Sequence, residues 1–206
     1  MLKNSSFIIH HFTMNFIYRI ILILSLATVI IFLPQPVQAE QLSFVNADEL
    51  FKRGVYQALM GNYKLAIADF TQVIQLRPDD ATAYANEGLA RAAMGDSKGA
   101  IADFNSALRL DPNLEVAYYN RGYVRFQLQD YQGALADFNR AIAIAPENAE
   151  AYHCRCLVRH QLGDIRGVAE DLHTTADLYL KAGKLDEYKG LLNVIKDIYS
   201  LNNATI

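Results

Sequence analysis

The side chains best suited to chemistry lie in one short stretch, HCRCLVRH, at positions 153–160. His153, Cys156 and His160 are spaced by three and four residues, so on a helix they would share one face. Imidazole nitrogens and thiolates are ligands that Zn²⁺ and copper ions accept. The alternative is that Cys156 is simply a small buried residue, as free cysteines often are. Because one helix offers only three ligands, we expect no metal site, and this trio is the candidate to test.

No other motif points to catalysis or to a cofactor. The sequence lacks a phosphate-binding glycine loop, an HExxH pair and a Cys–His pair with an obvious orienting partner. With 52% hydrophobic and 20% charged residues, the composition is that of a globular protein. The net charge of −3 and the lack of a basic stripe argue against nucleic-acid binding. We therefore expect a non-enzymatic protein without a small-molecule substrate.

Three similar segments begin 34 residues apart: AIADFTQVIQLRP at 66–78, AIADFNSALRLDP at 100–112 and ALADFNRAIAIAP at 134–146. Their apolar residues follow the three-to-four spacing of an amphipathic helix, and the closing proline ends it because proline cannot donate the next backbone hydrogen bond. A Gly-Asp or similar pair lies midway through each period, where it would end one helix and begin the next. The sequence therefore predicts one helical hairpin in each of four windows, 47–80, 81–114, 115–148 and 149–182.

Fixed slots recur in these windows. A small residue in the eighth slot would let two helices approach closely, and an aromatic residue in the twenty-fourth slot would fill the space beside it. The small slot holds Gly54, Gly88, Gly122 and Cys156, and the aromatic slot holds Phe70, Phe104, Phe138 and Leu172. The fourth window also lacks the closing proline, so no proline marks where its second helix ends. Since a 34-residue hairpin cannot fold alone, we expect an array that buries each hairpin against the next.

The pattern resembles the tetratricopeptide repeat over about two thirds of the chain. The resemblance implies an all-α solenoid of four hairpins, and we read residues 184–201, with an apolar stripe from Leu185 to Tyr199, as a C-terminal capping helix. It also implies a concave surface, lined by the first helices, that binds a peptide. The residues of this chain in the matching slots, our candidate partner-binding set, are Phe51, Val55, Leu59, Asn86, Leu89, Tyr119, Asn120, Tyr123, Phe126, His153 and Leu157.

This candidate face is unusually apolar and aromatic for a surface, which is typical of a binding face. The family members that bind chaperone C-termini hold the carboxylates with lysines, and here Asp48, Phe51 and Val116 are among the residues in those slots. Asn86 and Asn120 remain as groups for a ligand backbone. We therefore expect a scaffold that binds a peptide or helix of a partner protein, but not a chaperone tail. The alternative is a structural or assembly subunit of an envelope complex.

A ladder of charges also follows the period: one aspartate per window, with arginines in two further slots. It would serve either as a charged ligand site or as a set of ion pairs that fix how the repeats stack, and we favour the second role. The aspartates are Asp69, Asp103, Asp137 and Asp171, and the arginines are Arg53, Arg121 and Arg155 in one slot and Arg91, Arg125 and Arg159 in the other.

The N-terminus differs from the rest. Residues 20–33, IILILSLATVIIFL, form an apolar run after Arg19, and Val37-Gln38-Ala39 supplies small residues for a signal peptidase. We predict a signal peptide over 1–39, with Met1 or Met14 as its start, and a leader over 40–46. The protein would then be exported and periplasmic or secreted. An uncleaved N-terminal anchor, the alternative and the chain's one contact with a membrane, would also leave the domain outside the cytoplasm.

Overall fold

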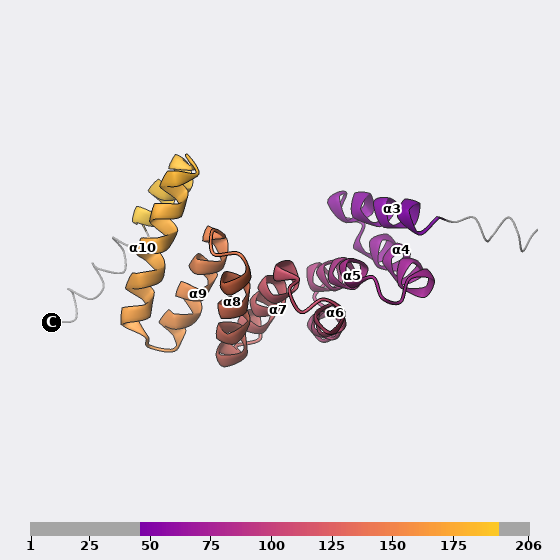
Figure 1. Cartoon of the computed structure of the whole chain (residues 1–206), viewed down its shortest axis with the longest axis horizontal. Helices are drawn as coiled ribbons and strands as arrows, with labels where there is room; N and C mark the ends of the chain where they lie inside the picture. The colour runs from indigo at the N-terminus through magenta and orange to yellow at the C-terminus, as the bar shows by residue number, and fades with distance from the viewer. Residues whose placement is uncertain (1–45, 194–206) are drawn as a thin grey trace, which may run out of the picture. The chain divides into compact units, whose positions relative to one another are not determined.

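The computed structural model describes residues 46–193, and within that range it contains helices, turns and no strand. The helices pair into four hairpins that follow one another in chain order (Figure 1). The predicted all-α solenoid of helical hairpins is confirmed. The pairs are α3 (Ala47–Leu59) with α4 (Tyr63–Leu76), α5 (Ala81–Ala93) with α6 (Ser97–Leu110), α7 (Glu115–Gln127) with α8 (Tyr131–Ile144), and α9 (Ala149–Gln161) with α10 (Ile165–Lys181).

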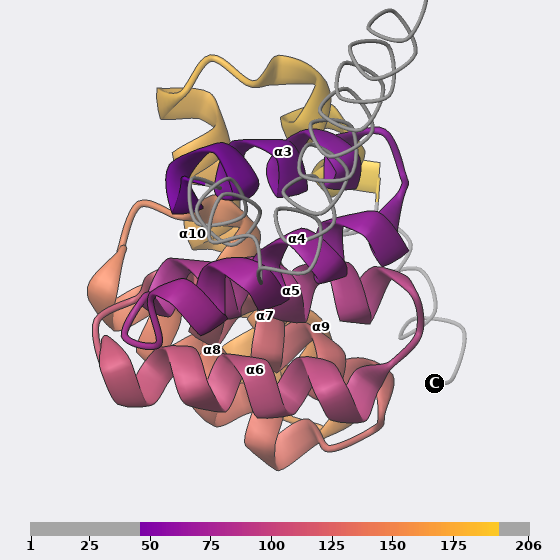
Figure 2. The ribbon, with the colours of Figure 1, turned by 90° about the vertical axis from the view of Figure 1, so that its right-hand side faces the viewer.

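Each first helix packs against its own second helix, and α5, α7 and α9 also pack against the second helix of the preceding hairpin. The first helices also contact one another in sequence, α3 with α5, α5 with α7 and α7 with α9. Figure 2, viewed from the α3 side, shows the successive hairpins one behind another. The first helices therefore form one continuous layer of the array, and residues in equivalent slots follow one another across it.

The turn inside each hairpin has the geometry that its sequence predicts. Gly61, Gly95 and Gly163 adopt positive φ angles of 75°, 82° and 76°, a conformation that glycine reaches without strain. In the second, third and fourth hairpins, the residue after the positive-φ position is an aspartate. Its side chain accepts a hydrogen bond from a backbone N–H of the second helix, as Asp130 does from Gly133 at 3.0 Å. The third hairpin has Gln129 at φ 63°, where a side chain costs about 1–2 kcal/mol.

The core is shared between neighbouring hairpins. Phe70 clusters with Ala90 of the next first helix, Phe104 with Val124, and Phe138 with Val158. All three phenylalanines are fully buried. In the first hairpin the residue equivalent to Ala90 is Tyr56, and its side chain is 56% exposed. The same slot is thus buried or open according to whether a preceding hairpin covers it, so each hairpin depends on its neighbour.

The array ends differently from its interior. The first three second helices stop two residues before Pro78, Pro112 or Pro146, whereas α10, with Leu180 in that slot, runs for 17 residues instead of 14. Gly183 then takes φ 69°, and the N–H of Lys184 bonds the carbonyl of Tyr179 at 2.9 Å. These are the features of the turn within a hairpin. Consequently α10 pairs with α9 in the fourth hairpin and also forms a hairpin with the helical residues 185–193.

Residues 185–193 are the described part of the predicted capping helix. Tyr188 and Leu191 pack on α10, whereas Leu185 and Leu192 of the same expected stripe are exposed. Residues 194–206 lie outside the described range, as do the predicted signal peptide and all of the predicted leader except Asn46. No helix within 46–193 has the length and apolarity needed to cross a membrane.

The close approach at the small slot yields a stability prediction. A Cβ on Gly88 would lie 3.0 Å from the Phe104 ring and 3.2 Å from the Ala100 carbonyl oxygen, and the backbone oxygen has little freedom to move. We expect Gly88→Val to lower the free energy of unfolding by about 1–3 kcal/mol, measured by urea titration with far-UV circular dichroism.

Gly190→Ala is the matched control, because a Cβ there meets no heavy atom within 4 Å. It should leave the free energy of unfolding unchanged or raise it by about 0.5–1 kcal/mol. Equal losses in the two variants would show that helix contact at Gly88 is not what matters.

Candidate functional site

The structure separates the three residues of the metal candidate. Cys156 is buried against the fourth hairpin's second helix, where burial and then Asp171 raise the pKa of its thiol to about 11. His153 is half-buried, with its pKa lowered by burial, and His160 is exposed. Within 46–193 no group of three or more His, Cys, Asp or Glu residues is placed to hold a metal ion. Cys156 therefore acts as the small apolar residue that the repeat pattern requires.

Several residues of the candidate partner-binding set point partly into the core. Phe51 packs edge-on against Phe70, with ring centroids 5.6 Å apart, and Val55 joins the same cluster. Tyr119 packs in the same way against Phe138 at 5.9 Å, and its hydroxyl lies 3.6 Å from the Cys154 sulfur. Burial raises the pKa of the Tyr119 hydroxyl. The side chains of Phe51, Val55 and Tyr119 therefore pack into the core and do not form an open surface.

Phe126 and His153 belong with this supporting group. Phe126 lies 5.9 Å from the ring of Tyr131, and both rings pack on the cluster of Ala134, Phe138 and Val158. His153 is half-buried on α9.

A second group of candidate residues is open to solvent. Leu89 is 37% exposed, Tyr123 is 45% exposed and Leu157 is 39% exposed. They are 34 residues apart, each directly after the small slot of its first helix, and Val55 holds the same place in α3. We call Leu89, Tyr123 and Leu157 the apolar row, and Val55 is left out because it is half-buried against the core cluster of the first hairpin. Because the first helices contact one another in sequence, the row crosses the array from the second hairpin to the fourth. Leu59, also in the candidate set, lies at the end of α3 and is the most exposed of all at 79%.

The two candidate asparagines are partly engaged within their own helices. The side-chain amide of Asn86 donates to the carbonyl of Thr82 at 2.8 Å, and that of Asn120 donates to Val116 at 2.7 Å. Each amide keeps a second N–H and its oxygen lone pairs for another partner. Both side chains are half-buried, so a ligand backbone on this face would meet one donor and one acceptor at each position.

The charge ladder is internal. Arg121 bonds Asp137 with both ends of its guanidinium, at 3.0 and 2.6 Å, and reaches Asn105 of the preceding hairpin at 2.6 Å. Arg155 does the same with Asp171 and with Asn139, 2.8 Å away. Asp137 and Asp171 are buried, and their carboxylates are occupied by two arginines each. The ladder therefore joins helices and neighbouring hairpins, which is the role that we favoured from the sequence.

At one position of the charge ladder we did not predict the residue's role, although the sequence shows a change of charge there. The slot that holds Arg53, Arg121 and Arg155 holds Glu87 in the second hairpin. Glu87 is buried and accepts hydrogen bonds from Arg91 at 2.6 Å and from the Thr71 hydroxyl at 2.9 Å. A reversal of charge at a repeated position was visible in the alignment of the four windows.

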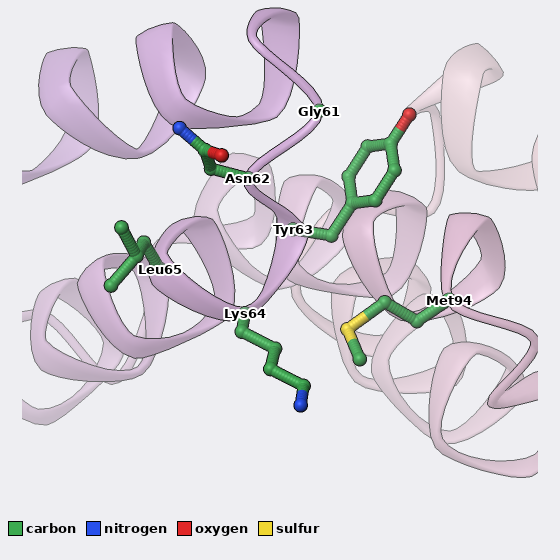
Figure 3. A pocket seen from close by; sticks show the side chains of 6 residues that line it. All are labelled: Gly61, Asn62, Tyr63, Lys64, Leu65 and Met94. Atoms are coloured by element: carbon green, nitrogen blue, oxygen red, sulfur yellow. The ribbon is translucent and has the colours of Figure 1, made fainter.

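Two hollows lie away from the apolar row. One, of about 360 Å³, borders the first turn and is lined by Gly61 to Leu65 and by Met94. Figure 3 shows that its Tyr63 and Lys64 side chains point in different directions, so its polar groups do not converge. The other, of about 390 Å³, lies between α10 and residues 188–192 and includes His173 and Asp177. Neither hollow is lined by a residue of the candidate set.

The split of the candidate set into supporting and open residues makes a prediction. Tyr119→Ala should remove a half-buried ring and its contact with Phe138, and lower the free energy of unfolding by about 2–3 kcal/mol. Tyr123→Ala should change it by no more than about 0.5 kcal/mol, because the side chain is 45% exposed and belongs to none of the core clusters described above. Thermal unfolding of both variants tests this, and a larger loss from Tyr123→Ala would reverse the two assignments.

Known structures share this architecture. The crystal structure of MamA has a TM-score of 0.64 and 23% identity, covering 68% of this chain and 81% of that one, so it shows the fold alone. The first TPR domain of Spaghetti (RPAP3), bound to the HSP90 peptide SRMEEVD, has a TM-score of 0.56 and 27% identity over 57% of this chain and 93% of its own. The TPR2B domain of yeast Sti1 in complex with pHsp70 has a TM-score of 0.53 and 25% identity, covering 56% and 97%.

Models of the repeat match the sequence directly. A TPR repeat model matches residues 88–129 and 122–163, and a tetratricopeptide repeat model matches residues 50–80. No curated protein matches the sequence. The matched segments describe repeats rather than a catalytic domain, and together they cover just over half of the 206 residues. With the hairpins, turns and shared cores described above, they show that the chain belongs to the tetratricopeptide repeat family.

Proposed function

We propose that this protein is a non-catalytic scaffold that binds a peptide or helix of a partner protein along the apolar row of its first helices. The observation that carries the proposal is the partial exposure of Leu89, Tyr123 and Leu157, one on each of three successive first helices that contact one another. Apolar side chains that stay exposed in register over three repeats are not needed to close the core. They offer regularly spaced anchors to an extended partner.

The row itself carries no charge, so binding would depend on burial of apolar surface. Asn86 and Asn120, one on each of the two central first helices, supply a free N–H and a free oxygen for the backbone of the partner. Affinity should therefore depend only weakly on salt, unlike binding that rests on ion pairs.

The comparisons support a peptide as the kind of ligand, since the RPAP3 domain holds an HSP90 peptide and the Sti1 domain is in complex with pHsp70. The chemistry of this chain differs at the positions where lysines would hold a terminal carboxylate. Asp48 forms an ion pair with Arg77, Phe51 is packed on Phe70, and Val116 is apolar and partly exposed. We therefore propose an apolar internal segment rather than a chaperone C-terminus as the ligand.

The predicted signal peptide supports a place of action outside the cytoplasm, in the periplasm or the medium, or on the outer side of a membrane if the segment remains as an anchor. The partner would then be another exported or envelope protein. Binding to such a partner could be transient or, in the assembly role that we also considered, permanent.

A three-residue variant tests the binding face. Leu89→Ser, Tyr123→Ser and Leu157→Ser together remove the exposed anchors. A displayed library of random peptides, selected on immobilised wild-type protein, supplies ligands, and we expect the triple variant to bind the selected peptides at least tenfold more weakly. Fluorescence anisotropy with labelled peptides measures the loss.

The control changes three exposed leucines of the second helices, Leu76→Ser, Leu110→Ser and Leu180→Ser, whose exposed fractions are similar to or larger than those of the row. This control should bind the selected peptides like the wild type. If both triple variants lose binding alike, or neither does, the apolar row is not the binding face.

The missing lysines yield a separate prediction. The peptide SRMEEVD should bind this protein at least a hundredfold more weakly than it binds a domain with the lysines, because nothing positively charged replaces them at Phe51 and Val116. Calorimetric titration at low salt measures this, and micromolar binding would overturn our choice of ligand class.

A further inference from the structure

At four recurring slots the second hairpin carries more negative than positive charge, and the other three hairpins do not. The slots are the two arginine positions of the first helix, the residue that caps the second helix and the recurring aspartate of the second helix. In the second hairpin they hold Glu87, Arg91, Asp96 and Asp103, which is three carboxylates against one guanidinium.

The equivalent groups of the other hairpins balance. The third and fourth have two arginines against two aspartates, and the first has one of each with two neutral side chains. They are Arg53, Gln57, Asn62 and Asp69 in the first, Arg121, Arg125, Asp130 and Asp137 in the third, and Arg155, Arg159, Asp164 and Asp171 in the fourth.

The single cation of these four slots in the second hairpin, Arg91, is shared unequally. Arg91 donates from its Nη2 to Glu87 at 2.6 Å, and its Nη1 lies 3.9 Å from Asp96. Its Nε lies 3.0 Å from Oδ2 of Asp103, but these two buried atoms are not aligned as a hydrogen bond and have no other partner. In the third hairpin, by contrast, the matching Asp137 accepts hydrogen bonds from both Arg121 and Arg125.

Within residues 46–193, Arg91 is the one cation among the charged groups that act on Asp103. From α5 it faces Glu87 and Arg91, and from the turn before α6 it faces Asp96. α4 contributes the neutral hydroxyl of Thr71, which donates to Glu87. The guanidinium of α7, Arg121, is turned to Asn105 and Asp137. The carboxylate of Asp103 is therefore held by one poorly aligned guanidinium, next to two other negative groups.

We infer that Asp103 is a proton-binding site, and that proton uptake there stabilises the packing of α5 on α6 when the surroundings turn mildly acidic. A protonated carboxyl removes the repulsion from Glu87, and it leaves Arg91 to pair with one buried carboxylate instead of two. The inference does not depend on the proposed function. It does bear on the apolar row, because Leu89 lies on α5 between Glu87 and Arg91.

The direction of the effect follows from proton linkage. Burial, and then the neighbouring Glu87, raises the pKa of Asp103 to about 7, from an ordinary value of 3.8. Between these two values the folded protein holds a proton that the unfolded chain releases, so stability falls as the pH rises through this window.

The test measures the pH dependence of urea unfolding of the full chain, together with site-specific carbon NMR of the Asp103 carboxyl. We expect the wild type to unfold at lower urea concentration at pH 8 than at pH 5.5, and the Asp103 carboxyl to titrate near pH 7. Asp103→Asn, a neutral isostere of the protonated acid, should lose most of this pH dependence and unfold at higher urea concentration than the wild type at pH 8.

Glu87→Arg restores the residue of the other hairpins and should likewise raise the urea midpoint at pH 8 and lower the titration midpoint of Asp103 by at least two pH units. Glu87→Gln serves the same purpose with less change of shape, and should lower that midpoint by about one unit. All three variants keep every histidine of the protein, so a difference between a variant and the wild type does not come from an imidazole group.

Two results would overturn the inference: a titration of Asp103 below pH 5 in the wild type, or an unchanged pH dependence of unfolding in Asp103→Asn.

Discussion

The close contact of two helices at a residue without a large side chain is the constraint on which this structure depends. Gly54, Gly88 and Gly122 let the ring of the following phenylalanine lie against the first helix, so close that a Cβ would stand only 2.9 to 3.2 Å from the ring. Each of these phenylalanine rings also packs against a residue of the next hairpin, as Phe104 does against Val124. Since a single hairpin encloses only part of its own core, stability comes from the array.

The same arrangement explains where function can reside. Side chains that fill the contacts between helices, such as Phe51 and Tyr119, are committed to stability, and the ladder of arginines and aspartates is committed to joining hairpins. On the first helices, the apolar row of Leu89, Tyr123 and Leu157 remains available to a partner. A repeat therefore separates the roles of adjacent slots: one slot closes the core, and the next faces outward.

The sequence was sufficient for the fold because its period, its small and aromatic slots and its prolines each act locally. It was not sufficient for the site, because an aromatic residue in a first-helix slot looks the same whether its ring leans inward, like Tyr119, or outward, like Tyr123. That choice depends on the volume left by neighbouring hairpins. The end of the array was also hidden: Leu180 in place of proline indicated a longer helix, but not that Gly183 would form another hairpin turn with α10. The reversed charge at Glu87 could be seen in the sequence. Predicting its effect on Asp103 required knowing that Asp103 and Arg91 form an ion pair beside it.

The dependence of each hairpin on its neighbours can be measured directly by comparing a peptide of residues 81–114 with the domain of residues 47–193, using circular dichroism during urea titration. The account predicts that the isolated hairpin is largely unfolded in water, whereas the domain unfolds in a cooperative transition. An isolated hairpin that kept its helices and unfolded cooperatively would contradict it.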